Sequence, residues 1–240
     1  MNLTRRKKRH YLLPLGLWLT CFFFIIPSLA IAEEGFEEKI IFSGSQATSF
    51  ENAILIESLQ EPTTIFGNFS SQGQSDFYLI KAQKGEQLLL EMSIPQISRL
   101  DSFRPAFFVV GPELPNNHDF PFVLPLPSEY KTYQVLPAER EKARIDSFSG
   151  NSYWITQAFQ YPIPDDAEYY IIVYDEKKQE GKYQLRIGTS QEKPFYRILT
   201  NPIDFLALRA WYNPIQVLIP TGLFAMAMMV FLVNILKRKK

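Results

Sequence analysis

The C-terminal end of the chain holds the feature that most constrains its fold. An almost unbroken apolar run covers residues 215–236. A helix of about 20 apolar residues is long enough to cross the hydrocarbon core of a bilayer. Basic residues mark the cytoplasmic side of such a span, and four follow it directly: Lys237, Arg238, Lys239 and Lys240. We therefore predict a transmembrane helix over 214–236 and a cytoplasmic basic tail over 237–240, with the preceding chain exported.

The N-terminus predicts the same topology. Five basic residues at 5–9 precede an apolar stretch that ends in Ala30-Ile31-Ala32. Small residues on either side of a larger one, after an apolar region, are what signal peptidase recognises. We expect a signal peptide over 1–32, cleaved after Ala32; an uncleaved helix would leave the middle of the chain outside as well. The result is a single-pass type I protein of the plasma membrane, with a periplasmic or extracellular N-terminal domain and a cytoplasmic C-terminus.

The single cysteine and the charge balance limit the functions of the exported part. Cys21 lies inside the predicted signal peptide, so the mature domain would have no disulfide, thiolate metal ligand or cysteine nucleophile. The chain has 25 basic and 25 acidic residues, but nine of the basic ones lie at the two predicted cytoplasmic ends, leaving 16 basic against 25 acidic outside. An acidic surface argues against nucleic acid as a partner.

Residues 33–193 have the pattern of one exported β-domain. Short runs rich in β-branched and aromatic residues alternate with turns that contain glycine, most clearly at 168–174 and 182–187. In the second run Tyr183, Leu185 and Ile187 are expected to face the core, and the residues between them to face water. Without a long amphipathic helix, this pattern predicts an all-β fold: a jelly-roll-like antiparallel β-sandwich followed by one transmembrane α-helix.

A proline-rich stretch over 112–164 interrupts the strand pattern. Its prolines favour extended loops, with short strands around 131–136 and 152–159. Long loops are where binding residues concentrate. Aromatic side chains here either stack on a sugar, pack on a protein partner or fill the core. The candidate binding residues are Tyr130, Tyr133, Tyr153, Trp154 and Tyr161.

Several motifs resemble a known family. The segment from Asp76 to Gly85 combines an aspartate, an aromatic strand and a glycine turn, and the terminal hairpin carries Gly181-Lys182-Tyr183-Gln184-Leu185. In this order they resemble the bacterial pre-peptidase C-terminal (PPC) domain, a jelly-roll-like sandwich of exported proteins, over roughly residues 50 to 188. The chain departs from that pattern at Ala167-Glu168, where glycine is usual, and in its long proline-rich insertion. The resemblance implies an accessory module, and related sandwiches sometimes bind calcium.

Few side chains suit catalysis or metal binding. His118 is the one histidine of the predicted exported part, and a Ser-His-Asp hydrolase would need it as its base. Carboxylates occur in pairs at both ends of the strand predicted at 168–174, and hard carboxylate oxygens suit Ca²⁺, although turn formation explains them equally well. These calcium candidates are Asp165, Asp166, Asp175 and Glu176. No other cofactor is predicted.

The segment over 194–213 connects the predicted sandwich to the predicted span. Thr200-Asn201-Pro202 is a helix-start pattern, and the residues that follow are mostly apolar. We expect a short interfacial helix here, with Trp211 and Tyr212 in the aromatic belt at the membrane surface.

These patterns predict a non-enzymatic membrane protein. Its exported β-sandwich would be a binding, accessory or scaffolding module for a protein partner in or near the membrane of the cell envelope. Two alternatives follow from individual residues. One is a surface carbohydrate-binding module that uses Tyr153 or Trp154, and the other is an envelope hydrolase that depends on His118.

Overall fold

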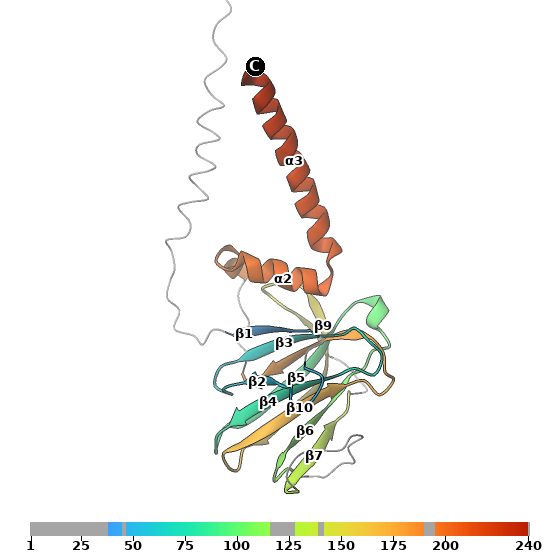
Figure 1. Ribbon diagram of the computed structural model, residues 1–240, viewed down its shortest axis with the longest axis vertical. Helices are drawn as coiled ribbons and strands as arrows, with labels where there is room; N and C mark the ends of the chain where they lie inside the picture. Colours follow the sequence, from blue (N-terminus) through green and yellow to red (C-terminus); the bar gives the residue numbers. More distant parts are fainter. Residues whose placement is uncertain (1–37, 45–46, 116–127, 139–141, 190–194, 240) are drawn as a thin grey trace, which may run out of the picture. The chain divides into compact units, whose positions relative to one another are not determined.

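The computed structural model describes residues 38–44, 47–115, 128–138, 142–189 and 195–239 (Figure 1). The predicted signal peptide with Cys21, the candidate base His118 and the tail residue Lys240 lie outside the described residues.

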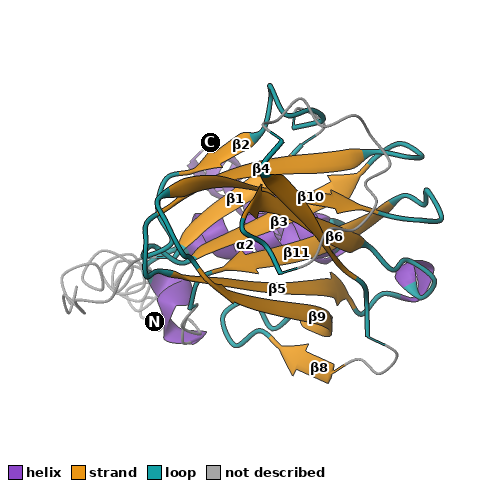
Figure 2. Cartoon of the chain, turned by 90° about the horizontal axis from the view of Figure 1, so that it is seen from below, coloured by secondary structure: helices purple, strands orange, loops and turns teal. Residues whose placement is uncertain are grey.

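Eleven strands form two sheets in the described part of the chain (Figure 2). The six-stranded sheet has the order β1 (Lys39–Ser43), β3 (Thr63–Phe69), β11 (Gly181–Ile187), β5 (Gln87–Pro95), β9 (Ser152–Pro162) and β8 (Lys142–Ile145). The five-stranded sheet has the order β2 (Ile54–Ile56), β4 (Ser75–Ala82), β10 (Ala167–Tyr174), β6 (Ala106–Pro112) and β7 (Tyr130–Val135). The all-β prediction is confirmed.

Pairing is antiparallel except at one edge of each sheet. There β1 pairs with β3 in parallel, and β2 pairs with β4 in parallel. The chain alternates between the two sheets along β1, β2, β3 and β4, so neither edge strand is joined to its neighbour by a hairpin. A hairpin forces an antiparallel pair, whereas a strand that returns from the other sheet can pair in either direction.

The main core lies between the inner faces of the two sheets. Ile65 and Leu185 of the six-stranded sheet pack in one cluster with Tyr78, Ile80 and Ile171 of the five-stranded sheet, and all five are fully buried. The predicted inward alternation of β11 is confirmed, because Tyr183, Leu185 and Ile187 are buried too. The water-facing half of that prediction fails at Gln184, which is 3% exposed, since the outer face of this sheet is itself covered.

A glycine makes room for the largest side chain of β11. A Cβ on Gly67 of β3 would lie 2.1 Å from the Cζ atom of Tyr183, on the neighbouring strand. No methyl group fits at that distance, so the Tyr183 ring occupies the space that a side chain at 67 would need.

Three helical segments follow the sandwich: η3 (Phe195–Leu199), α2 (Pro202–Tyr212) and α3 (Ile215–Lys239). Helix α2 begins at the proline that the sequence predicts, since a proline in the first turn lacks only an N–H that would have had no intrahelical partner. Within α3, Ile215–Lys237 is long and apolar enough to cross a membrane, and none of its most apolar stretch is buried. A short 3₁₀ turn, η2 (Ser98–Leu100), follows β5.

Candidate functional site: the helix-covered face of the six-stranded sheet

The outer face of the six-stranded sheet is covered by α2 (Figure 1). We call this the helix-covered face. Phe66 of β3 and Tyr153 of β9 stand outward from the sheet and pack with Leu208 and Tyr212 of α2, together with Phe148 from the turn before β9. All five are at most 7% exposed. This second apolar cluster makes α2 a packed layer of the domain.

Aromatic and polar contacts fix α2 at its C-terminal end. The Trp211 ring meets Phe66 edge-on, with ring centroids 4.9 Å apart, and the Tyr212 ring meets Tyr153 at 5.8 Å. The Tyr212 hydroxyl lies 3.1 Å from the carbonyl oxygen of Ser152, to which it donates. A hydrogen bond from an aromatic hydroxyl to the sheet backbone is directional, so it fixes where α2 lies on the sheet in addition to holding it there.

A lysine adds a charged contact at the same end of α2. Lys182 of β11 donates from Nζ to the carbonyl oxygen of Trp211, and its Nζ atom lies 5.5 Å from the centroid of the Trp211 ring. Burial lowers the pKa of Lys182, and the nearby Arg99 lowers it further. An ammonium group suits this place, because a helix C-terminus carries partial negative charge.

Trp211 and Tyr212, which the sequence predicts in a membrane aromatic belt, also contact the sandwich. Tyr212 is 7% exposed and Trp211 is half-buried, and both rings pack against the sandwich. Sequence alone shows an aromatic pair beside an apolar span, which is the belt pattern. It does not show the aromatic residues of β3 and β9 that these rings contact.

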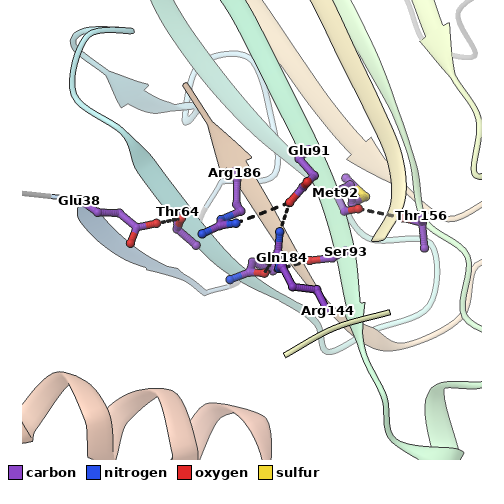
Figure 3. Close-up of polar contacts among 9 residues, drawn as sticks. All are labelled: Glu38, Thr64, Glu91, Met92, Ser93, Arg144, Thr156, Gln184 and Arg186. Carbon is purple, nitrogen blue, oxygen red and sulfur yellow. Dashed lines mark hydrogen bonds and ion pairs between the residues drawn. The ribbon is translucent and has the colours of Figure 1, made fainter. Parts of the chain in front are cut away.

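A polar cluster lies next to α2 on the same face (Figure 3). Glu91 of β5 accepts a hydrogen bond from Nη1 of Arg144 on β8, and its carboxylate lies 3.7 Å from Nη1 of Arg186 on β11. Gln184 accepts from Nη2 of Arg144 at 2.8 Å and from the Ser93 hydroxyl at 2.9 Å. Beside them, the Thr64 hydroxyl donates to Glu38. The cluster comprises Glu38, Thr64, Glu91, Ser93, Arg144, Gln184 and Arg186.

The hydrogen bonds and ion pairs of the cluster connect neighbouring strands of the sheet. The side chains of Arg144 and Arg186 are only 14% and 12% exposed, and that of Glu91 is 32% exposed. Their charges are directed at one another, and Figure 3 shows the side chains converging from several strands. Charged hydrogen bonds of this kind are strong, and here they hold the edge strand β8 through Arg144. The two hydroxyl groups of the cluster are used in the same way, since Ser93 donates to Gln184 and Thr64 donates to Glu38.

The space around the cluster is small. A cavity of about 20 Å³ lies between α2 and the sheet. Part of the cluster lines it, namely Glu38, Thr64, Gln184 and Arg186, together with Phe148, Leu208 and others. That volume holds one water molecule. A larger hollow of about 310 Å³ opens over β5 and β9, lined by Leu89, Glu91 and Gln160 among others. It is at the lower limit of ligand-pocket size, and its one charged group, Glu91, is already paired with an arginine.

The structure distributes the predicted aromatic candidates over three different clusters. Tyr133, Trp154 and Tyr161 pack against the main core, and the Tyr161 hydroxyl donates to the carbonyl of Glu113 at 2.6 Å. Tyr130 packs against a third cluster, on the outer face of the five-stranded sheet. Tyr153, at 1% exposed, belongs to the cluster under α2 and cannot stack on a sugar at the surface. These residues lie on β7 and β9, and they form no common platform.

The predicted calcium candidates lie at opposite ends of β10, which has eight residues. Such a strand is roughly 25 Å long, so the two pairs cannot share an ion. Asp165 is 2.8 Å from Nζ of Lys84, and Asp166 accepts from the Lys84 backbone N–H at 2.7 Å. Asp175 accepts from the Gln179 N–H at 2.8 Å, and Glu176 is exposed. Within the described ranges, no three His, Cys, Asp or Glu side chains are placed to hold a metal.

A buried carboxylate that was not among the predicted site residues joins the two sheets. Asp76 of β4 is 0% exposed and accepts from the Tyr183 hydroxyl of β11 at 2.5 Å and from Gln74 at 2.9 Å. The Tyr183 and Tyr78 hydroxyls are 2.6 Å apart. Burial raises the pKa of Asp76 to about 6, and the hydrogen bonds from Tyr183 and Gln74 oppose that rise.

The signal for this network is present in the sequence. The period of two in β4 places Asp76 on the same face as Tyr78 and Ile80, which is the core face. Both Asp76 and Tyr183 belong to the motifs that resemble the PPC domain, and the structure brings the two motifs into direct contact. Because the carboxylate is fully buried, it is a structural link and not a ligand site.

Comparison with known proteins adds little to this description. No family model matches the chain, and no curated protein matches it by sequence. Among solved structures it is similar to PliG of Aeromonas hydrophila, a periplasmic inhibitor of g-type lysozyme, with a TM-score of 0.31 and 13% identity over 63% of this chain and 98% of that one. It is also similar to CorA, a surface-associated copper-binding protein of Methylomicrobium album BG8, with a TM-score of 0.28 and 7% identity over 65% and 98%. These likenesses are too low to support an argument about function. The PPC resemblance stays a prediction.

Proposed function

We propose that this chain is a single-pass membrane protein whose exported β-sandwich is a binding or scaffolding module for a protein partner at the cell envelope. One observation carries the proposal. Helix α2 is packed into the sandwich through Leu208 and Tyr212, and only Asn213 and Pro214 separate it from α3. A domain joined in this way to a membrane span is held at the bilayer surface, where its partners would lie in or beside the same membrane.

The junction between the two helices is itself ordered. Arg209 of α2 donates from Nη1 to Oε1 of Gln216 in the first turn of α3, at 2.9 Å. The Ile215 N–H lies 3.2 Å from Oδ1 of Asn213, to which it donates, so Asn213 caps the start of α3. These bonds connect the packed layer to the span directly, which supports a fixed attachment instead of a flexible tether.

The chemistry of the described surface also favours binding over catalysis. The charged groups that cluster on the helix-covered face are paired with one another, and the buried Asp76 is enclosed between the sheets. With the predicted topology, the basic tail from Lys237 onward lies in the cytoplasm and the acidic sandwich lies outside.

A detergent pull-down of the full chain, followed by mass spectrometry, tests the proposal. The matched control joins residues 1–37 directly to 194–240, which keeps the predicted signal peptide and the predicted transmembrane helix and removes the sandwich. We expect a stoichiometric partner that the full chain captures and the control does not. A monomeric full chain that captures nothing above the control would count against the proposal. A reporter fused after Lys240 that folds on the outer side would contradict the topology.

A further inference from the structure

Helix α2 and the preceding turn η3 expose a second set of large apolar side chains. Four large side chains there are strongly exposed: Phe195 at 72%, Leu199 at 69%, Ile203 at 79% and Leu206 at 43%. We call them the exposed apolar edge. Ile203 and Leu206 are three positions apart and so lie side by side on α2, and exposed apolar side chains grouped in this way mark a surface that another apolar phase covers.

The edge and the packed face are on opposite sides of α2. At about 100° per residue, Ile203 and Leu206 lie across the helix axis from Leu208 and Tyr212, which contact the sandwich. The two charged residues of α2, Asp204 and Arg209, fall between these faces. A helix on the surface of a water-soluble domain has one apolar face. Helix α2 has two, and only one of them is covered by the sandwich.

The place of α2 in the chain indicates what covers the second face. The candidate span begins at Ile215, and the path from Tyr212 to Ile215 is at most about 10 Å at full extension. The headgroup region on each side of a bilayer is roughly 5–8 Å deep. The C-terminal end of α2 is therefore within reach of the level at which α3 enters the hydrocarbon, where an interfacial helix inserts its apolar side chains.

From these observations we propose that the exposed apolar edge inserts into the interfacial layer of the same bilayer that α3 spans. The occupant of this surface is lipid. The helix-covered face then points toward the membrane, α2 lies between bilayer and sheet, and the five-stranded sheet points away. This inference rests on the proposed membrane span, and it adds the orientation of the sandwich and a second contact with lipid.

Depth-dependent fluorescence quenching in nanodiscs tests the orientation. The full chain in a Cys21→Ser background receives one cysteine, carrying an environment-sensitive dye, in place of Ile203, Leu223 or Leu136. Each position is more than half exposed in the described structure. Leu223 lies inside α3, and Leu136 follows β7 in the sheet that is predicted to point away from the membrane. Nanodiscs with one copy each are prepared with ordinary or brominated phospholipid.

The expected result is strong quenching at positions 203 and 223 and none at 136, with at least half of the emission at 203 lost in brominated lipid. Quenching at 223 but not at 203 would overturn the inference and leave the anchor in place, so that the edge would be free for a protein partner. A failure at 223 would instead contradict the proposed span. A blue shift at 203 without bromine quenching would indicate burial against protein, which also overturns the inference.

Discussion

The buried Asp76 makes the stability of the sandwich depend on pH in an unusual direction. Its pKa is raised from 3.8 to about 6 in the folded protein, mainly by burial. The folded state thus holds this proton more tightly than the unfolded state does. The stabilisation from the protonated group is fully present below pH ~4 and is lost as the pH rises through about 6. A shift of about two units corresponds to about 3 kcal/mol, because each unit is worth about 1.4 kcal/mol.

The Asp76→Asn variant removes this dependence with little change of shape. The asparagine is neutral at every pH, and its amide can donate to Tyr183, whose hydroxyl then donates to Tyr78, 2.6 Å away. We expect urea unfolding of the full chain in detergent micelles, followed by near-ultraviolet circular dichroism, to show wild type losing stability relative to Asp76→Asn as the pH rises from 4.5 to 7.5. The relative loss over this range should be about 2 kcal/mol of the total of about 3, because the unfolded carboxyl is already mostly ionised at pH 4.5.

A second variant tests the cause of the shift. The hydrogen bond from Tyr183 lowers the pKa of Asp76, so Tyr183→Phe should raise the folded-state pKa and extend the loss of stability to a pH above about 6. Parallel changes in the stabilities of wild type and Asp76→Asn across this range would refute the argument. The carboxylate would then have the same pKa in the folded and unfolded states. A loss of stability that ends at a lower pH in Tyr183→Phe than in wild type would refute the assigned role of the hydrogen bond.

Three further predictions concern packing and charge, and all are measured by chemical unfolding. Gly67→Ala should destabilise the sandwich by roughly 1–3 kcal/mol, because the new Cβ meets a buried tyrosine ring. The control Gly44→Ala has no atom within 4 Å of its Cβ and should cost much less. Equal losses would contradict the packing argument. Leu208→Ala should cost roughly 2–4 kcal/mol, because it opens a cavity under α2. Tyr212→Phe should cost only about 1 kcal/mol, because it removes one hydroxyl. A larger loss for Tyr212→Phe would show that the hydroxyl matters more than the apolar contact. Glu91→Gln should cost roughly 1–2 kcal/mol by removing the negative charge that faces Arg144 and Arg186, with a smaller difference in high salt. A difference unaffected by salt would argue against an ionic role.

The parts of this fold that the sequence predicts are those set by local pattern. The apolar helix at Ile215–Lys237, which is long enough to cross a membrane, follows from composition and length alone, and β11 follows from strict alternation. The start of α2 follows from the chemistry of Pro202. Each depends on residues within a few positions of one another, where propensity and periodicity act directly.

The proline-rich region shows how a correct local rule led to an incomplete picture. Its prolines favour loops, yet β6 ends at Pro112 and β9 ends at Pro162. A proline at a strand end interrupts few ladder hydrogen bonds, so the strands between the prolines survive. The short strand expected over 152–159 is one of 11 residues, and it brings Tyr153 into the core beneath α2.

The features that could not be predicted from the sequence depend on contacts between distant segments. Trp211 contacts Phe66, and Gln184 is buried because Arg144 and Ser93 bond to it from two other strands. No periodicity within one segment contains this information. Asp76 is a partial exception, because its place in the alternation already assigned it to the core face.

The two-residue connection between α2 and α3 limits what this protein can reach. A domain on a long flexible linker searches a volume that grows with linker length, and it can meet partners at many distances from the bilayer surface. Here Asn213 and Pro214 permit no such search, and the bond between Arg209 and Gln216 restricts swivelling further. In the proposed membrane protein, the sandwich can contact a partner only on surfaces that lie close to the bilayer, within about the thickness of the two packed sheets. Lateral diffusion in the plane of the membrane, and not extension away from it, would then determine how often the module meets its partner.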